Sequence, residues 1–470
     1  MGAGGQLRAL YKHPLGTGNF DLYVGSDVSG VWKAANISPT AISSTQINYQ
    51  YVSNHRIFRF VNKFVHSDLM PNNLFTLSRG GIDLIDLLGT NSMKEIKVMS
   101  AAGVELDMSQ SWVSDMHIAA TGNANLFNVW FTTGNTQLYD LEKKAATIED
   151  IYYGVYDLTL KTISIGGSVS LNSLGKDRNV YCLQFHNNNT PAVTDDFLII
   201  GTQNGLYKFK ISTNQVLTKV GLVGITNALP DETHVSSITV DDHDNDISTN
   251  LKVYITVSGS GIYYADAITN STTWTSCVTI LTGTGLTNPS STSDITTVQG
   301  SNLYSKLFIF KSALSNLPTG YLVTTSNNQV TDANTNTRYS VAYYVNADVT
   351  NNNLPGSEWV ALDVGSNNVN NDFGWNTSRP SANINSALLL DNSSILMGKS
   401  GNILLGTIGI NSWPTTEWKQ LYTIANSNSN CSTQPLYKHI GYVNTATRTV
   451  MPDGNGNLWI GQLDRFLWNS

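Results

Sequence analysis

Apolar residues recur along this chain in short runs of strand length, and helical spacing is rare. The recurring unit is an apolar run, a tight turn rich in glycine or asparagine, and a second apolar run. Its clearest copy has apolar runs at 252–257 and 261–265 on either side of the turn Ser258-Gly259-Ser260. Because glycine adopts the positive φ that a tight turn requires, this pattern predicts a β-hairpin.

The same pattern recurs through the whole chain. Hairpins are predicted at 22–34, 74–86, 129–141, 197–211, 252–265, 307–325, 395–408 and 458–469. The segments before them predict one further strand each, beginning near Leu7, Ile57, Met116, Val180, Ser236, Ile295, Ser386 and Tyr437. Several hairpins are followed by a segment containing tryptophan, which predicts a fourth strand.

Four-stranded antiparallel units that recur along a chain are typical of a β-propeller. Radial stacking of such sheets buries both faces of each blade, which agrees with strands that are apolar on both sides. The sequence therefore predicts an all-β protein: a single β-propeller over 1–470 with about eight four-stranded blades, or seven if part of 307–362 is an insertion. Closure of the ring predicts that the strand at Leu7 and the hairpin 458–469 are spatial neighbours.

Two kinds of segment depart from this pattern. The stretch 326–384 is the longest polar one, and we predict that it is a long loop or insertion within a blade. Helical spacing of apolar residues is found only at 93–99 and 141–151, which predicts at most two short helices there.

Composition limits the possible functions. The chain has 470 residues, of which 41% are hydrophobic and 13% charged, and its formal net charge is −7. The hydrophobic content suffices for a folded core, and a mildly acidic chain is a poor binder of nucleic acid. No apolar run is long enough to span a membrane, and the first residues lack the apolar segment of a secretory signal. We therefore expect no nucleic-acid partner, no membrane insertion and no signal peptide.

The polar residues are mostly Asn, Thr, Ser and Gly, and charged residues are about half as frequent as the usual quarter of a soluble domain. Such surfaces are frequent among virion and extracellular β-proteins. Together with the missing signal, they favour a virion component, such as a phage capsid, tail or fibre-associated protein, in many symmetric copies. Its partners would be other virion subunits or a host-surface glycan or protein. A secreted or cell-surface adhesin or receptor domain is the alternative location.

One repeat resembles a known family. The segment SITVDD…LKVYITVSGSGIYYAD…TTW, and Lys12-His13-Pro14 with the hairpin at 23–32, resemble the repeat of sialidase-type Asp-box (BNR-like) β-propellers. That family includes xyloglucan hydrolases and sortilin-like receptors. The resemblance covers most of the chain as a fold pattern and implies a propeller. The Asp-box itself is degraded, because the stretch before Trp274 lacks its aspartate and glycine.

Asp27 is the catalytic candidate that this resemblance implies. In the xyloglucan hydrolases an aspartate in the matching turn is one of two catalytic carboxylates, and its partner comes from a second propeller. This chain is too short for a second propeller, and the arginine triad of sialidases has no visible spacing. A turn aspartate that accepts backbone N–H groups is the simpler explanation. We therefore predict no catalytic residue, with a carbohydrate-active hydrolase using Asp27 as the alternative.

Metal and cofactor sites are not predicted. Asp242, Asp244 and Asp246 have the spacing of a calcium loop, but Ile247 replaces its glycine and Val253 its final glutamate. The three cysteines are far apart and lack metal-ligand spacing. We therefore expect no cofactor, with this aspartate run as a weak calcium candidate.

Aromatic residues in polar segments are the predicted binding residues. Trp112, Trp375 and Trp413 lie outside the hairpins, Trp359 and Trp375 lie in the 326–384 stretch, and Asn376 could bond to sugar hydroxyls. Exposed aromatic rings stack on sugars or anchor protein partners, although such loops can also pack back on a blade. The sequence thus predicts a non-catalytic binding or structural module.

Overall fold

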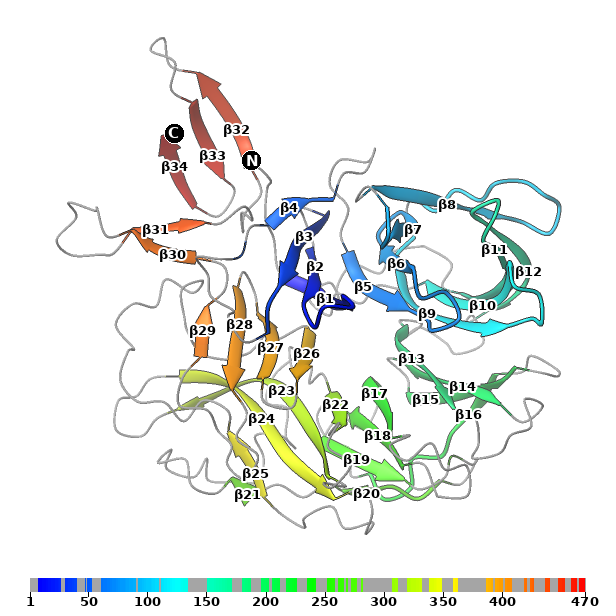
Figure 1. Ribbon diagram of the computed structural model, residues 1–470. Coiled ribbons are helices and arrows are strands. Elements are labelled where there is room, and N and C mark those ends of the chain that lie inside the picture. Colours follow the sequence, from blue (N-terminus) through cyan, green and yellow to red (C-terminus); the bar gives the residue numbers. More distant parts are fainter. Residues whose placement is uncertain are drawn as a thin grey trace.

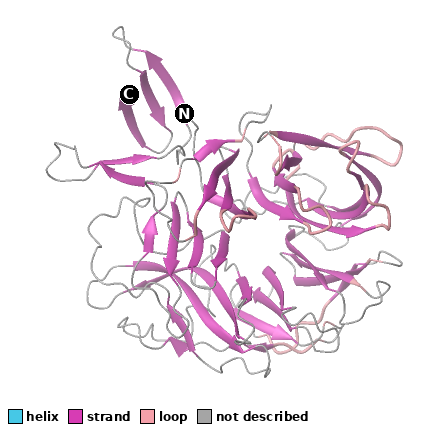
Figure 2. Ribbon diagram, in the orientation of Figure 1, coloured by secondary structure: helices cyan, strands magenta, loops and turns pink. Residues whose placement is uncertain are grey.

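The computed structural model describes residues 7–26, 30–39, 47, 49–52, 61–89, 92–109, 111–133, 150–170, 180–186, 196–202, 205–211, 217–225, 235–241, 252–257, 261–265, 268, 272–276 and 280–281. Beyond residue 281 it describes the strands given below. Figure 2 shows strands joined by loops, and no helix among the described residues, so the all-β prediction is confirmed. Within this part of the chain, no helix has the length and hydrophobicity to cross a bilayer.

The first four blades are sheets of consecutive antiparallel strands. The first blade contains β1 (Leu7–Pro14), β2 (Phe20–Ser26), β3 (Gly30–Ile37) and β4 (Tyr49–Tyr51). The second contains β5 (Val61–His66), β6 (Asn73–Ser78), β7 (Gly81–Asp86) and β8 (Met93–Met99). The third contains β9 (Val113–Ala120), β10 (Leu126–Thr133), β11 (Asp150–Asp157) and β12 (Thr162–Ser170). The fourth contains β13 (Val180–His186), β14 (Phe197–Thr202), β15 (Gly205–Lys210) and β16 (Leu217–Lys219).

The remaining strands complete the ring and extend beyond it. The fifth blade contains β17 (Val235–Asp241), β18 (Lys252–Val257), β19 (Gly261–Ala265) and β20 (Thr275–Ser276). The sixth contains β22 (Leu307–Lys311), β23 (Thr319–Thr331), β24 (Arg338–Asp348) and β25 (Glu358–Ala361), with β21 (Ile280–Leu281) parallel to β25. The seventh contains β26 (Ser386–Asp391), β27 (Ser394–Lys399), β28 (Asn402–Thr407) and β29 (Trp418–Gln420). Then follow β30 (Thr423–Asn426) and β31 (Leu436–His439), and the sheet of β32 (Thr447–Pro452), β33 (Leu458–Gln462) and β34 (Arg465–Asn469).

The described strands close a ring of seven blades (Figure 1). The inner strands contact one another in the order β1, β5, β9, β13, β17, β22 and β26, and β26 contacts β1. Side chains of the first and seventh blades share one apolar cluster, which includes Trp32 and Leu396. The N–H of Leu10 donates to Oγ of Ser386 at 3.0 Å, and Lys12 donates to the carbonyl of Leu390. The β-propeller is confirmed, with the lower of the two predicted blade numbers.

The prediction that hairpin 458–469 forms a blade next to Leu7 is wrong. This hairpin pairs with β32 in a sheet of its own, which lies outside the ring in Figure 1. The first blade packs against β26 and β27 instead. The first blade already packs against the second blade on one face and against the seventh blade on the other, so the ring closes without the last hairpin.

A glycine near the end of the second strand lets neighbouring blades approach closely. A methyl group at Gly25 in β2 would lie 2.5 Å from Cγ1 of Val61, the first residue of β5 in the next blade. A methyl group at Gly201 in β14 would lie 2.6 Å from the carbonyl oxygen of Val235, the first residue of β17. The two positions are equivalent in the repeat, and each lies against the first residue of the next blade's inner strand, where a Cβ has no room.

The second and third blades form one continuous sheet. Their outermost strands β8 and β12 pair in parallel, with Lys97 opposite Thr162 and Met99 opposite Ser164. Their inner strands β5 and β9 are also in contact, so the sheet curls around a shared apolar cluster that includes Phe75, Phe131 and Tyr156. This pairing breaks the repeat at one point of the ring.

Asp115 in β9 connects three consecutive blades. Its carboxylate is buried and lies 2.6 and 2.7 Å from Nζ of Lys63 in β5. It also accepts the N–H of Leu183 in β13 at 3.1 Å and that of Met116 at 2.8 Å. The inner strands β5, β9 and β13 do not pair with one another, so this carboxylate supplies polar contacts between them that strand pairing does not.

Some strand predictions need correction. The helix expected at 93–99 is the strand β8, because its backbone pairs with β7 and β12. The strand expected before the second hairpin is described from Val61, and its expected residues 57–60 lie outside the described residues. In the third blade, β10 pairs with β11 rather than with a strand before residue 141. The range 326–384 is not one loop, since it contains the end of β23 and all of β24 and β25. Residues 362–385 lie outside the described residues.

Candidate binding site

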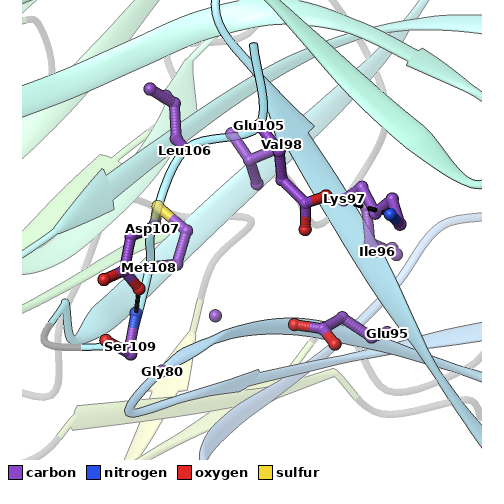
Figure 3. Close-up of a pocket in the computed structure, with 11 residues that line it drawn as sticks. Gly80, Glu95, Ile96, Lys97, Val98, Glu105, Leu106, Asp107, Met108 and Ser109 are labelled. Atoms are coloured by element: carbon purple, nitrogen blue, oxygen red, sulfur yellow. Dashed lines mark hydrogen bonds and ion pairs between the residues drawn. The ribbon is translucent and has the colours of Figure 1, made fainter.

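A cavity of about 320 Å³ opens at the outer strand of the second blade (Figure 3). Its walls come from the start of β7, from β8 and from the segment that follows β8. The lining residues are Gly80, Gly81, Glu95, Ile96, Lys97, Val98, Glu105, Leu106, Asp107, Met108 and Ser109. The volume is at the lower end of the range for small-ligand pockets.

The cavity exists because two partners of β8 do not meet. On one flank of β8, pairing with β7 ends at Ile82 opposite Ile96. Further along, the chain turns back and bonds to β8 again, with Leu106 N–H donating to the carbonyl of Val98 at 2.7 Å. Between these two pairings, the edge of β8 around Lys97 has neither segment beside it, and the cavity occupies this space.

Short hydrogen bonds hold the returning segment in place. Gly103 has a φ of 74° and donates its N–H to the carbonyl of Ser100 at 2.8 Å. Asp107 Oδ1 accepts the N–H of Ser109 at 2.9 Å, and Gly80 donates to the carbonyl of Ser111 at 2.8 Å. A wall that is already ordered needs little further ordering when a ligand binds.

The lining is acidic at its opening and apolar at its base. Glu95, Glu105 and Asp107 carry three negative charges, and Lys97 carries one positive charge, so the formal sum is −2. Lys97 Nζ pairs with Glu105 Oε2 at 2.9 Å, with both side chains at least half exposed. Figure 3 shows the carboxylates of Glu95 and Asp107 on opposite sides of the cavity.

The apolar part of the lining belongs to the core of the two joined blades. Ile96 and Val98 are buried in the cluster between the second and third blades, and Leu106 and Met108 pack against it. The cavity therefore offers carboxylates, an ammonium group and aliphatic carbon within one opening.

Trp112, a predicted binding residue, lies beside this cavity. It is half-buried and forms an isolated β-bridge with Arg79, the neighbour of Gly80. The Arg79 guanidinium lies over the Trp112 ring at 5.5 Å from its centroid, in a cation–π arrangement. Trp112 is therefore placed at the border of the cavity, outside its lining.

The other predicted site residues are not brought to this cavity. Trp359 lies in the strand β25 rather than in a loop. Asp27, Asp242, Asp244, Asp246, Trp375, Asn376 and Trp413 lie outside the described residues. Among the residues that are described, no three His, Cys, Asp or Glu side chains are grouped as metal ligands.

Sequence reasoning missed the residues that line the cavity. Glu95 and Lys97 lie in the segment 93–99, for which the sequence predicts a helix, and Glu105 lies shortly after it. A helix would place these side chains on different sides of its surface. Gly80-Gly81 and Gly103 could have indicated the turns that border the cavity, because all three glycines have positive φ. The cavity also depends on strand register, which no short motif reports.

Two histidines of the third and fourth blades stack on aromatic rings. His117 in β9 stacks on Phe185 in β13 with ring centroids 4.4 Å apart, and His186 stacks on Phe197 at 4.8 Å. Burial lowers the pKa of His117 to about 4, against a smaller opposing effect of Asp115. Burial also lowers the pKa of His186 to about 4. Both rings are therefore neutral at pH 7 and act as packing groups rather than as acids or bases.

Comparisons with known proteins give the fold alone. No protein-family model and no curated protein sequence matches the chain. Among solved structures, an ancestral GH74 enzyme is 17% identical with a TM-score of 0.61, over 100% of this chain and 53% of the enzyme. This chain therefore spans about half the length of that enzyme.

Two other solved structures are more distant. YCF48 bound to a D1 peptide is 8% identical with a TM-score of 0.42, over 88% of this chain and 95% of that one. The extracellular domain of a hybrid two-component system from B. thetaiotaomicron is 10% identical with a TM-score of 0.31, over 99% and 63% of the two chains. The likeness to the GH74 enzyme and the closed ring of described strands together identify this chain as a β-propeller that resembles the Asp-box type in fold.

Proposed function

We propose that this propeller is a non-catalytic attachment module of a virion, and that it binds a host-surface glycan. The observation that carries this proposal is the cavity at the outer strand of the second blade. It combines polar side chains, an aliphatic base and prearranged walls, so it offers a sugar both hydrogen-bonding groups and hydrocarbon. Low charge and polar loops support a virion surface, as argued from the sequence.

The position of the cavity also supports attachment. It lies at the periphery of the ring, where a rigid scaffold presents it to large partners. The Arg79–Trp112 pair at its border adds an aromatic and a guanidinium group, two types that are enriched where binding energy is concentrated. A surface-bound glycan could approach this side of the blade without entering the central part of the ring.

The test is binding of the full-length chain to host cells. Fluorescently labelled protein should bind intact cells, and enzymatic removal of surface glycans should abolish binding. Trp112→Ala should reduce binding several-fold, whereas Trp32→Phe, a buried change between the first and seventh blades, should not. Binding that survives glycan removal would contradict the proposal and favour a protein receptor or another virion subunit.

A hydrolase is the second candidate. Glu95 and Asp107 face the cavity from opposite sides, and glycoside hydrolysis uses two carboxylates on either side of the scissile bond. Release of reducing sugar from a β-glucan by the wild type, lost in Glu95→Gln, would establish the enzyme and displace the attachment proposal. Loss of such activity in Asp27→Asn would instead establish the site that the family resemblance implies.

A further inference from the structure

We infer that the cavity of the second blade accepts an uncharged sugar of one or two rings and rejects acidic sugars. This inference rests on the proposed glycan binding and assigns the ligand class of that same site. It follows from three properties of the lining: its charge, its aliphatic base and its fixed shape.

The charge of the lining determines what is rejected. Three carboxylates surround an opening that contains a single ammonium group, and this ammonium is already paired with Glu105. Arg79 does not reverse this balance, since its guanidinium lies on Trp112 and is not part of the lining. A ligand carboxylate would meet a negative field and would find no unpaired cation among the lining residues, so uronic and sialic acids are disfavoured.

The same carboxylates suit sugar hydroxyl groups. Hydroxyls donate hydrogen bonds, and a bond from O–H to a carboxylate is stronger than one to a neutral acceptor. Glu95 and Asp107 lie on opposite sides of the cavity, so hydroxyls on two edges of one ring have acceptors. Lys97 supplies donors for a ring or glycosidic oxygen.

The aliphatic base matches the other surface of a sugar ring. Leu106 and Met108 present hydrocarbon backed by the core of the joined blades. A pyranose ring has C–H groups on its faces and hydroxyls at its edges, so it can place hydrocarbon on this base while its hydroxyls reach the carboxylates. A volume of about 320 Å³ limits the ligand to one or two rings.

The experiment compares matched sugars on the full-length chain. Saturation-transfer NMR and titration should show binding of methyl glucoside or N-acetylglucosamine, and binding of glucuronic acid that is at least tenfold weaker. Glu95→Gln should weaken the binding of the neutral sugars several-fold. It should also narrow the difference in affinity between the neutral sugars and glucuronic acid, because one negative charge is removed. Asp68→Asn is the matched control, since Asp68 is an exposed carboxylate in the β5–β6 turn of the same blade, and it should change neither value.

The outcomes separate this inference from the proposed function. Tighter binding of glucuronic acid than of methyl glucoside would overturn the ligand class and leave glycan attachment standing. Unchanged sugar binding in both Glu95→Gln and Glu105→Gln would show that the sugar binds elsewhere and would overturn the assignment of the cavity. Glycan-dependent cell binding without affinity for any single sugar would overturn the inference while the attachment proposal holds.

Discussion

Replacing Asp115 should destabilise the ring more than replacing its ion-pair partner Lys63. The carboxylate of Asp115 is buried, and it accepts the backbone N–H groups of Leu183 and Met116. Asp115→Ala would leave both of these buried N–H groups without an acceptor. Each such loss costs about 1–3 kcal/mol, so we expect the free energy of unfolding to fall by about 2–6 kcal/mol.

The ion pair itself contributes less. The side chain of Lys63 is 47% exposed, so water solvates its ammonium once Asp115 is gone. Lys63→Met would leave the carboxylate of Asp115, which is only 4% exposed, with its two backbone N–H donors alone. It should therefore cost more than the loss of an exposed pair, which contributes about 0–1 kcal/mol, but less than Asp115→Ala, which removes the shared acceptor. Asp115→Asn keeps one acceptor oxygen and should lie between the two. Glu105→Gln, which breaks a more exposed pair, should stay within about 0.5 kcal/mol of the wild type.

The assay is urea unfolding of the four variants, followed by hydrogen–deuterium exchange of the 180–186 segment. Because a chain of this size can unfold through intermediates, exchange at Leu183 supplies the local measurement. We expect faster exchange there in Asp115→Ala and no change in Lys63→Met. Equal losses of stability in these two variants would refute the reasoning, since the charge pair and not the hydrogen bonds from the backbone N–H groups would then hold the blades.

Three further predictions follow from the packing between blades. Because burial lowers the pKa of His117 from 6.5 to about 4, the folded state binds fewer protons than the unfolded state, and stability present above pH 6.5 is lost as the pH falls toward 4. Between pH 7 and pH 5, the free energy of unfolding of His117→Phe should therefore fall by about 2 kcal/mol less than that of the wild type, as measured by urea unfolding. An equal fall in both proteins would contradict this. Gly201→Ala forces a methyl group against the carbonyl of Val235 and should cost about 1–3 kcal/mol, measured by denaturant midpoint, whereas Gly103→Ala in an exposed loop should not disturb that interface. Deleting 447–470 should leave the thermal midpoint of the ring nearly unchanged, since β26 closes it; a large drop would show that β32–β34 stabilise the ring.

The hairpins were predictable from sequence because their signals are local. Gly81 and Gly205 have φ values of 130° and 105°, and each ends a turn in which a preceding hydroxyl bonds to its carbonyl. Thr202 Oγ1 donates to the carbonyl of Gly205 at 2.9 Å, and Ser78 Oγ to that of Gly81 at 3.1 Å. Each of these two hydrogen bonds joins residues within four consecutive positions, so one sequence suffices to find such turns.

The closure of the ring was not predictable in the same way. Leu10 and Ser386 are 376 positions apart, and no local pattern states that the strand at Ser386 rather than the last hairpin meets β1. The helix prediction for 93–99 was wrong for a related reason. Apolar residues at Met93 and Ile96 fit helical spacing, yet pairing with β7 and β12 decides the backbone, and tertiary contacts override so weak a local preference.

In a repeat protein, the positions that all blades share serve the ring, so specific chemistry is expected where a blade differs from the others. The glycines at 25 and 201 occupy equivalent places and set the spacing between blades. The second blade departs from the repeat twice: β8 pairs in parallel with β12, and the chain after β8 turns back on it before β9 begins. The cavity lies at the junction of these two departures. Its carboxylates belong to these departures and not to the positions that the blades share, which supports the binding role proposed for them.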